Sequence, residues 1–139
     1  MRGLVFIAAN CYAAIGVIDY PERYCADKDV SCAGPSQATD RAPLGAASDS
    51  ERGGTLHERI VAGTRARLHY LWDVFADTFP AKPYLSGEHL GALDLLATVV
   101  SKWSGSREHL AKSRPEFRAL LHEVESDPRI AAVFARHWP

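Results

Sequence analysis

The sequence lacks the motifs of most catalytic and cofactor-binding proteins. It has no glycine-rich phosphate loop and no G-x-S-x-G nucleophile elbow. No nucleophile stands with a base and an orienting group in a recognisable pattern. The six histidines are scattered without metal-ligand spacing and are expected at the surface: His57, His69, His89, His109, His122 and His137. The sequence therefore predicts no catalytic residue, no metal site and no cofactor held by this chain itself.

The sequence also has few cysteines and almost no net charge. The three cysteines, Cys11, Cys25 and Cys32, form no C-x-x-C pair and leave one unpaired. Free thiols in a reducing compartment fit this number better than a disulfide framework, so we expect a cytoplasmic protein. The formal net charge is −1, and no basic or aromatic motif of a nucleic-acid module occurs. We expect neither nucleic acid nor a membrane as partner.

Strand-like alternation and internal repeats are missing from the sequence as well. A chain of 139 residues is sufficient for one domain with a real core, so we expect a single all-α domain over residues 1–139. Residues 26–54 contain no aromatic residue and are rich in Ala, Ser, Asp, Gly and Pro. Such a stretch cannot bury enough surface to offset its ordering entropy, so we predict a flexible loop there.

The chain does have one strongly apolar stretch, Leu85 to Trp103. After Gly91 its large apolar residues point in nearly every direction around a helical turn: Leu93, Leu95, Leu96, Val99, Val100 and Trp103. A helix that is apolar on all sides must be buried on all sides or lie in a membrane. About a dozen residues are too few for a bilayer, which needs ~20. We predict a buried central helix surrounded by the rest of a bundle of about five helices.

The start of this helix carries a capping pattern. With Gly91 at the N-cap, Asp94 falls at the third helical position, from which a carboxylate can accept a hydrogen bond from the cap amide. Leu90 and Leu95 have the spacing of a hydrophobic staple. A buried carboxylate needs partners, and unpaired amides at a helix start provide them. We therefore interpret Gly91 and Asp94 as a structural N-cap rather than as catalytic groups.

Four further helices are predicted by hydrophobic periodicity and end signals. The first spans residues 3–18 and ends before Pro21. The second runs from Thr55 to Phe79, with Leu56 and Ile60 on its inner side and a capping box between Thr55 and Glu58. The third begins at Pro115, after a turn at 104–106. The fourth begins at Pro128, with Asp127 as its N-cap.

The order of these motifs resembles the C-terminal helical domain of the glutathione S-transferase family. The pattern Leu-x-Gly-x-x-Leu-cap-x-x-Asp-Leu over residues 85–95 is similar to the capping segment of that domain. The family usually has Ser or Thr at the cap and Ala before the acid, whereas this chain has Gly91 and Leu93. The segments 6–12, 114–121 and 127–134 also resemble family helices, so the similarity covers most of the chain outside residues 26–54.

The resemblance implies that glutathione binding and substrate binding are carried out by two different domains. Family members carry a thioredoxin-like domain that binds glutathione, and its pattern is missing here. This chain alone would then bind glutathione poorly and would not conjugate it to electrophiles. It would supply a wall of the cleft for a small hydrophobic electrophile, and part of a homodimer surface. Matched by position, Tyr12 and Val5 would be substrate-site residues, and glutathione would enter only with a thioredoxin-like partner domain.

Three alternatives remain open on the sequence. Domains resembling this one also serve as non-catalytic protein-interaction modules. Residues 1–18, an apolar run after Met1-Arg2, have the outline of a secretory signal peptide, which would make the mature protein a small secreted helical protein. Tyr12 also fits core packing as well as it fits a ligand site.

Overall fold

All regular elements of the chain are helices in the part that the structure describes. The structure is a computed structural model, and it describes residues 1–24 and 55–138. In these ranges extended pairing is limited to one isolated bridge between Tyr84 and Gly87. The prediction of an all-α fold is therefore confirmed. The predicted flexible loop over 26–54 lies outside the described residues.

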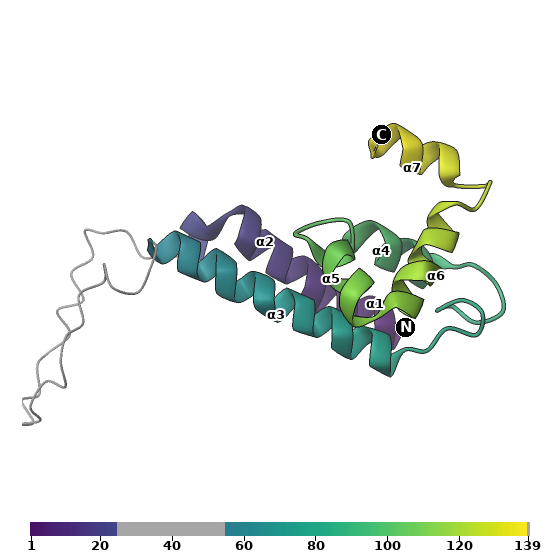
Figure 1. The fold of residues 1–139 in the computed structure, drawn as a ribbon, viewed down its shortest axis with the longest axis horizontal. Helices are drawn as coiled ribbons and strands as arrows, with labels where there is room; N and C mark the ends of the chain where they lie inside the picture. Colours follow the sequence, from purple (N-terminus) through teal and green to yellow (C-terminus); the bar gives the residue numbers. More distant parts are fainter. Residues whose placement is uncertain (25–54, 139) are drawn as a thin grey trace, which may run out of the picture.

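Two long helical segments lie side by side and form the frame of the molecule (Figure 1). The first is continuous from α1 (Arg2–Phe6) through the π-helix η1 (Ile7–Tyr12) to α2 (Ala13–Asp19), and the short 3-10 helix η2 (Pro21–Tyr24) follows it. The second is α3 (Leu56–Thr78). Their shared core consists of Ile7, Cys11, Ala14, Ile15 and Ile18 from the first segment, and Leu68, Leu71, Trp72 and Phe75 from α3.

Three shorter helices complete the core. They are α4 (Ala92–Val100), α5 (Ser106–Ser113) and α6 (Pro115–Glu125). Helix α5 packs on α3 and α6, and α4 packs on α1, η1 and α6. The last helix, α7 (Ala131–His137), stands apart from this group in Figure 1. As predicted, Pro115 occupies the first turn of its helix.

The prediction that residues 92–103 form a helix buried on every side is wrong. Helix α4 ends at Val100, its leucines Leu93, Leu95 and Leu96 are only partly buried, and Trp103 lies beyond it with 36% of its surface exposed. The reason is that α1, η1 and α6 cover only part of its circumference. The most enclosed large side chains, Trp72 and Phe75, belong instead to α3.

Two helix boundaries also differ from the sequence prediction. Residues 106–113 form α5, whereas the sequence analysis predicted a turn at 104–106 and no helix before Pro115. Leu110 is the one large apolar residue in that segment, and a single residue produces no periodicity. Helix α7 begins at Ala131 rather than at Pro128. The carboxylate of Asp127 accepts hydrogen bonds from the backbone and side chain of Arg129, which closes a separate turn before the helix.

Helix α3 begins as predicted but is less covered than predicted. Its capping box is present: the Glu58 amide donates to Thr55 Oγ1 at 3.3 Å, and the Thr55 amide donates to Glu58 Oε2 at 2.6 Å. Leu56, however, is 57% exposed and Ile60 is only half-buried. The start of α3 extends beyond α4, α5 and α6 in Figure 1 and has α2 beside it. The buried residues of α3 accordingly begin at Leu68.

The N-terminal helical segment is long and apolar enough to cross a membrane. Its residues Arg2–Asp19 have a mean hydropathy of 1.4, and 28% of them are buried in the structure. Core helices of soluble proteins and signal sequences satisfy the same criterion of length and composition. The exposed side of the segment carries Val5, Ala8, Ala9, Tyr12 and Ala13, with no charged residue between Arg2 and Asp19.

Candidate functional site

The carboxylate of Asp94 links the start of α4 to the loop before it. Asp94 is fully buried and accepts three backbone hydrogen bonds, from Leu85 (2.7 Å), Ser86 (3.2 Å) and Gly91 (3.0 Å). The bond from Gly91 has the geometry that the sequence predicts for this N-cap. The bonds from Leu85 and Ser86 extend the same carboxylate to the preceding loop. All of these partners are backbone amides, so the role of Asp94 in the structure is to hold the chain in place.

The side chain of Ser86 explains why the cap residue is glycine. A Cβ atom at Gly91 would lie 2.7 Å from Ser86 Oγ and 2.8 Å from Ser86 Cβ, which is closer than real Cβ atoms approach. The backbone at Gly91 is extended, with φ −141°, and gives no reason for glycine by itself. A side chain at this cap position would therefore require Ser86 to move.

Tyr12 is exposed and lies at the end of a π-helical turn. Its side chain is 58% exposed, so the interpretation of Tyr12 as core packing is wrong. The π-helix η1 ends at Tyr12, and such turns in α-helices are frequent at functional sites. Asn10 Nδ2 donates to the Phe6 carbonyl at 3.0 Å within this segment. The neighbouring residue Cys11 points the other way and is fully buried.

Tyr12 lines a groove of about 340 Å³ at the far end of the N-terminal segment. Its ring centroid lies 6.4 Å from that of Trp103, which comes from the turn after α4. Arg23 lies over the Tyr20 ring at 4.2 Å. The groove is lined by aromatic and apolar residues, with one acid and one base: Tyr12, Ile15, Asp19, Tyr20, Arg23, Tyr24 and Trp103 with Gly16. Aromatic walls of this kind suit a flat apolar ligand.

The structure does not bring the other predicted substrate residue, Val5, into this groove. Val5 is 60% exposed on α1, on the same outward side of the segment as Tyr12. Trp103 is a groove residue that the sequence analysis placed in a buried helix. No local signal could have found it, because Trp103 meets Tyr12 only through tertiary packing.

A larger cavity of about 510 Å³ lies where the end of α3 meets the start of α6. Phe79, Phe117 and Leu120 contribute its apolar lining. Arg114 at its edge donates two hydrogen bonds of 2.7 Å to Asp77, so this guanidinium already has a carboxylate partner. Neither Tyr12 nor Val5 lines this cavity, and none of its residues was singled out as a site residue from the sequence.

Among the described residues, the lining of the groove contains one carboxylate, Asp19, and no cysteine or histidine. Burial raises the pKa of the Cys11 thiol to about 12, so it stays protonated at neutral pH and is a poor nucleophile. Within the described ranges 1–24 and 55–138, no three His, Cys, Asp or Glu side chains gather in a way that could hold a metal ion. The described residues around Tyr12 therefore supply apolar contacts and no thiolate.

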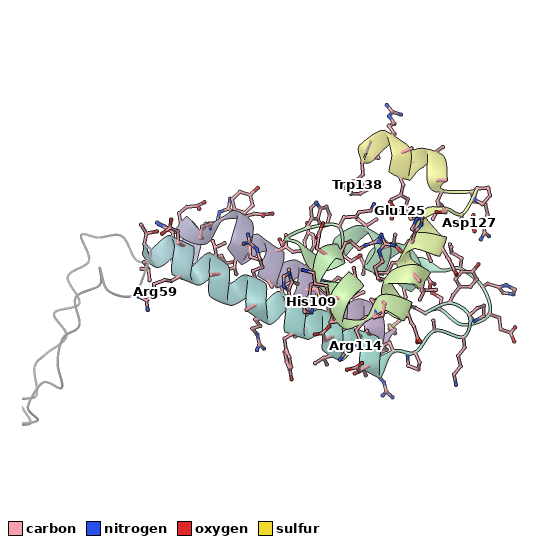
Figure 2. The ribbon with its side chains drawn as sticks, in the orientation of Figure 1. Arg59, His109, Arg114, Glu125, Asp127 and Trp138 are labelled. Carbon is pink, nitrogen blue, oxygen red and sulfur yellow. The ribbon has the colours of Figure 1, made fainter. Side chains whose placement is uncertain are left out.

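A polar cluster joins α3 to α5 and brings together two histidines that were expected to be scattered on the surface. The rings of His69 and His109 stack with centroids 4.6 Å apart. His109 Nε2 lies 2.9 Å from Asp73 Oδ2, and Ser113 Oγ donates to Asp73 Oδ1 at 2.7 Å. Figure 2 shows His109 where α5 meets α3. A hydrolytic triad needs histidine between serine and aspartate, whereas here aspartate stands in the middle, so the cluster ties the helices together.

The surroundings of His69 disfavour the charged form of its ring. Burial lowers the pKa of His69 below its ordinary value of 6.5, because the charged ring would lose hydration. The neighbouring charges of His109 and Arg65 lower the pKa of His69 further, whereas the contact of its Nε2 with the Ser104 carbonyl at 3.1 Å and the charge of Asp73 raise it. The unfolded chain therefore binds a proton at this histidine more tightly than the folded chain does.

Replacing His69 by glutamine should flatten the acid side of the stability profile. Since the folded pKa of His69 lies below 6.5, the wild-type protein loses stability as pH falls through 6.5, and the loss levels off below the folded pKa. His69→Gln removes this dependence while keeping an amide donor for the Ser104 carbonyl. Urea unfolding between about pH 7.5 and pH 5.5 measures the difference. The exposed His57→Gln is the control, and an identical pH slope in His69→Gln and wild type would contradict the assignment.

Comparisons with known proteins give no family for this chain. No family model matches it, and neither the curated proteins nor the solved structures contain a match.

Proposed function

We propose that this chain is a ligand-binding helical domain of the glutathione S-transferase C-terminal type. Its groove at Tyr12 and Trp103 forms the hydrophobic wall for a small aromatic electrophile. Conjugation to glutathione takes place only when a thioredoxin-like domain supplies the thiolate site, so the chain alone is inactive. The observation that carries this proposal is the exposed position of Tyr12 in an aromatic groove with Trp103.

Two further features support the proposal. The reach-back bond from Gly91 to Asp94 is the contact expected from the resemblance over residues 85–95. The N-terminal segment leaves an apolar outward side that includes Val5 and Tyr12, which in the proposed arrangement lies toward the partner domain or a second copy of the chain. Burying such a surface is favourable by roughly 25 cal/mol per Å² of apolar area.

Binding of a non-reactive nitroaromatic, such as 2,4-dinitrotoluene, tests the groove. The three tryptophans, Trp72, Trp103 and Trp138, give separate indole N–H resonances in a ¹⁵N NMR spectrum. We expect the ligand to shift the Trp103 resonance and to leave that of Trp72 in place, because Trp72 is fully buried. Tyr12→Ala should weaken binding by about three- to tenfold through the loss of one aromatic wall.

The matched control is Tyr70→Ala, which removes an equally exposed tyrosine from α3. Equal affinity in Tyr12→Ala and Tyr70→Ala would overturn the groove as the binding site. The catalytic half of the proposal is tested separately, with glutathione and a chromogenic aryl halide. We expect no turnover above the uncatalysed rate, and turnover well above it would contradict the statement that this chain lacks a thiolate site.

A non-catalytic protein-interaction module of the same fold is the second candidate. It is favoured by the outward side of the N-terminal segment, where Val5 is 60% exposed and no charge interrupts residues 3–18. The nitroaromatic titration discriminates the two. If the chain is an interaction module, the small ligand should leave all three indole resonances unmoved. If it is a substrate wall, the ligand should shift the Trp103 resonance.

A further inference from the structure

A polar pocket of about 280 Å³ lies where the end of α4, the start of α5 and α6 meet. Its lining is almost entirely charged: Lys102, Arg107, Glu108, Arg118, His122 and Glu125. The lining contains three permanent cations and two carboxylates, so it has an excess of one positive charge. It shares no lining residue with the groove at Tyr12, and nothing in the proposed function uses it.

The carboxylate of Glu125 interacts with two of these cations. Lys102 Nζ donates to Glu125 Oε1, and Arg107 Nη2 lies 3.4 Å from Glu125 Oε2. The side chains of Lys102, Arg107 and Glu125 are only 17%, 14% and 25% exposed. Charges withdrawn from water need compensation by opposite charge. Glu125 contacts both cations, and Glu108, the second carboxylate of the lining, acts on Arg107 through space, so the positive charge of Arg118 is the one in excess.

The guanidinium of Arg107 is fixed in position before any ligand binds. Its Nε donates to Ser101 Oγ at 2.8 Å, and its Nη2 donates to the Thr98 carbonyl at 3.1 Å. Burial lowers the pKa of Arg107, and the attraction of Glu125 opposes that effect. Among the described residues, none accepts a hydrogen bond from the remaining nitrogen, Nη1. A rigid guanidinium with a free nitrogen is suited to bind an oxyanion.

Arg118 provides a second guanidinium at the same pocket. It precedes His122 by four residues and Glu125 by seven on α6, so the three side chains lie on one face of that helix. Arg118 is exposed, and its side chain makes no hydrogen bond or ion pair within the described part of the chain. The nearby charge of Arg118 acts on Arg107 through space, as expected for cations that share a pocket.

We propose that this pocket binds a phosphate-sized oxyanion, as inorganic phosphate or as the phosphate group of a small monoester. Arg107 and Arg118 donate to its oxygens, and Lys102 adds a third positive charge. Lys102 Nζ also lies 5.7 Å from the ring centroids of Phe134 and Trp138 on the α7 side. Figure 2 shows Glu125 and Trp138 close together on the side of the bundle that faces α7. Binding of the oxyanion is therefore expected to affect the environment of Trp138.

The test is a ¹⁵N NMR titration of the full chain at constant ionic strength, with sodium chloride replaced stepwise by inorganic phosphate or by phenyl phosphate. We expect saturable shifts of the Arg107 Nε–H and Trp138 indole resonances. Arg118→Gln, an exposed substitution, should weaken binding about tenfold through the loss of one charge-assisted donor. Arg67→Gln, an equally exposed arginine on α3, is the matched control and should bind as wild type does.

The two probes distinguish the two forms of the ligand. Tighter binding of phenyl phosphate assigns the site to a monoester, and equal binding assigns it to the phosphate group alone. Shifts that rise linearly without saturation with both probes would overturn the site. An unchanged affinity in Arg118→Gln would overturn it as well, because the pocket would then not be the place of binding.

Discussion

Replacing Asp94 by alanine is expected to lower the free energy of unfolding by about 3 to 4 kcal/mol. The substitution leaves the amides of Leu85, Ser86 and Gly91 without their acceptor. Each buried donor that loses its partner costs about 1 to 3 kcal/mol, and water can reach these partly buried amides only in part. Urea unfolding followed by circular dichroism measures the change.

Two companion variants separate lost hydrogen bonds from lost charge. Asp94→Asn keeps one carbonyl acceptor in the same shape, so we expect about half of the alanine effect. Glu123→Ala, an exposed acid on α6, should stay within about 0.5 kcal/mol of wild type. A loss in Asp94→Ala no larger than that in Glu123→Ala would show that the three amides do not depend on Asp94.

The contrast between Asp94 and Trp103 shows how far the sequence can predict this structure. The bond between Asp94 and Gly91 joins residues three apart, and such spacing is visible in the sequence. The bonds from Leu85 and Ser86 reach over nine and eight residues, respectively, and depend on the path of the loop. The contact of Trp103 with Tyr12 depends on the whole fold, so no local pattern could predict it.

Helix α4 shows why an apolar pattern can mislead. The run of leucines indicates that the helix can be buried on every side, but burial also requires neighbours on every side. The neighbours of α4 are α1, η1 and α6, and they leave Leu93, Leu95 and Leu96 partly open. Under the proposed function, the open side of α4 is available for contact with a partner domain.

Motif analysis could not predict the polar cluster between α3 and α5 or the charged pocket around Glu125, for a related reason. His109 meets Asp73 across 36 residues, and Lys102 meets Glu125 across 23. The sequence analysis placed Lys102 in the predicted helix over residues 92–103, and it predicted no helix for the polar stretch that contains Arg107. Helix α5, which carries Arg107, His109 and Ser113, was itself missed for lack of an apolar period. The polar contacts of its side chains could be recognised only after the helix had been placed.

Replacing Phe75 by alanine is expected to have the largest effect on stability, about 4 kcal/mol. Phe75 is fully buried at the centre of an aromatic cluster. Its ring centroid lies 4.8 Å from that of Phe79, 5.7 Å from those of Phe6 and Trp72, and 5.9 Å from that of Phe117. The substitution removes burial and ring contacts between the N-terminal segment, α3 and α6 together. Unfolding by urea, followed by circular dichroism, measures the loss.

The control for this prediction lies on the same helix. Tyr70 is 61% exposed, so Tyr70→Ala deletes an aromatic ring without opening a cavity and should change stability by no more than about 0.5 kcal/mol. Phe75→Leu keeps most of the buried volume and should cost about 1 to 2 kcal/mol. If Phe75→Ala and Tyr70→Ala were equally stable, the core would not be organised around α3. The leucine-rich helix α4 would then have to be reconsidered as its centre, and the position of Tyr12 at an open groove would lose its structural basis.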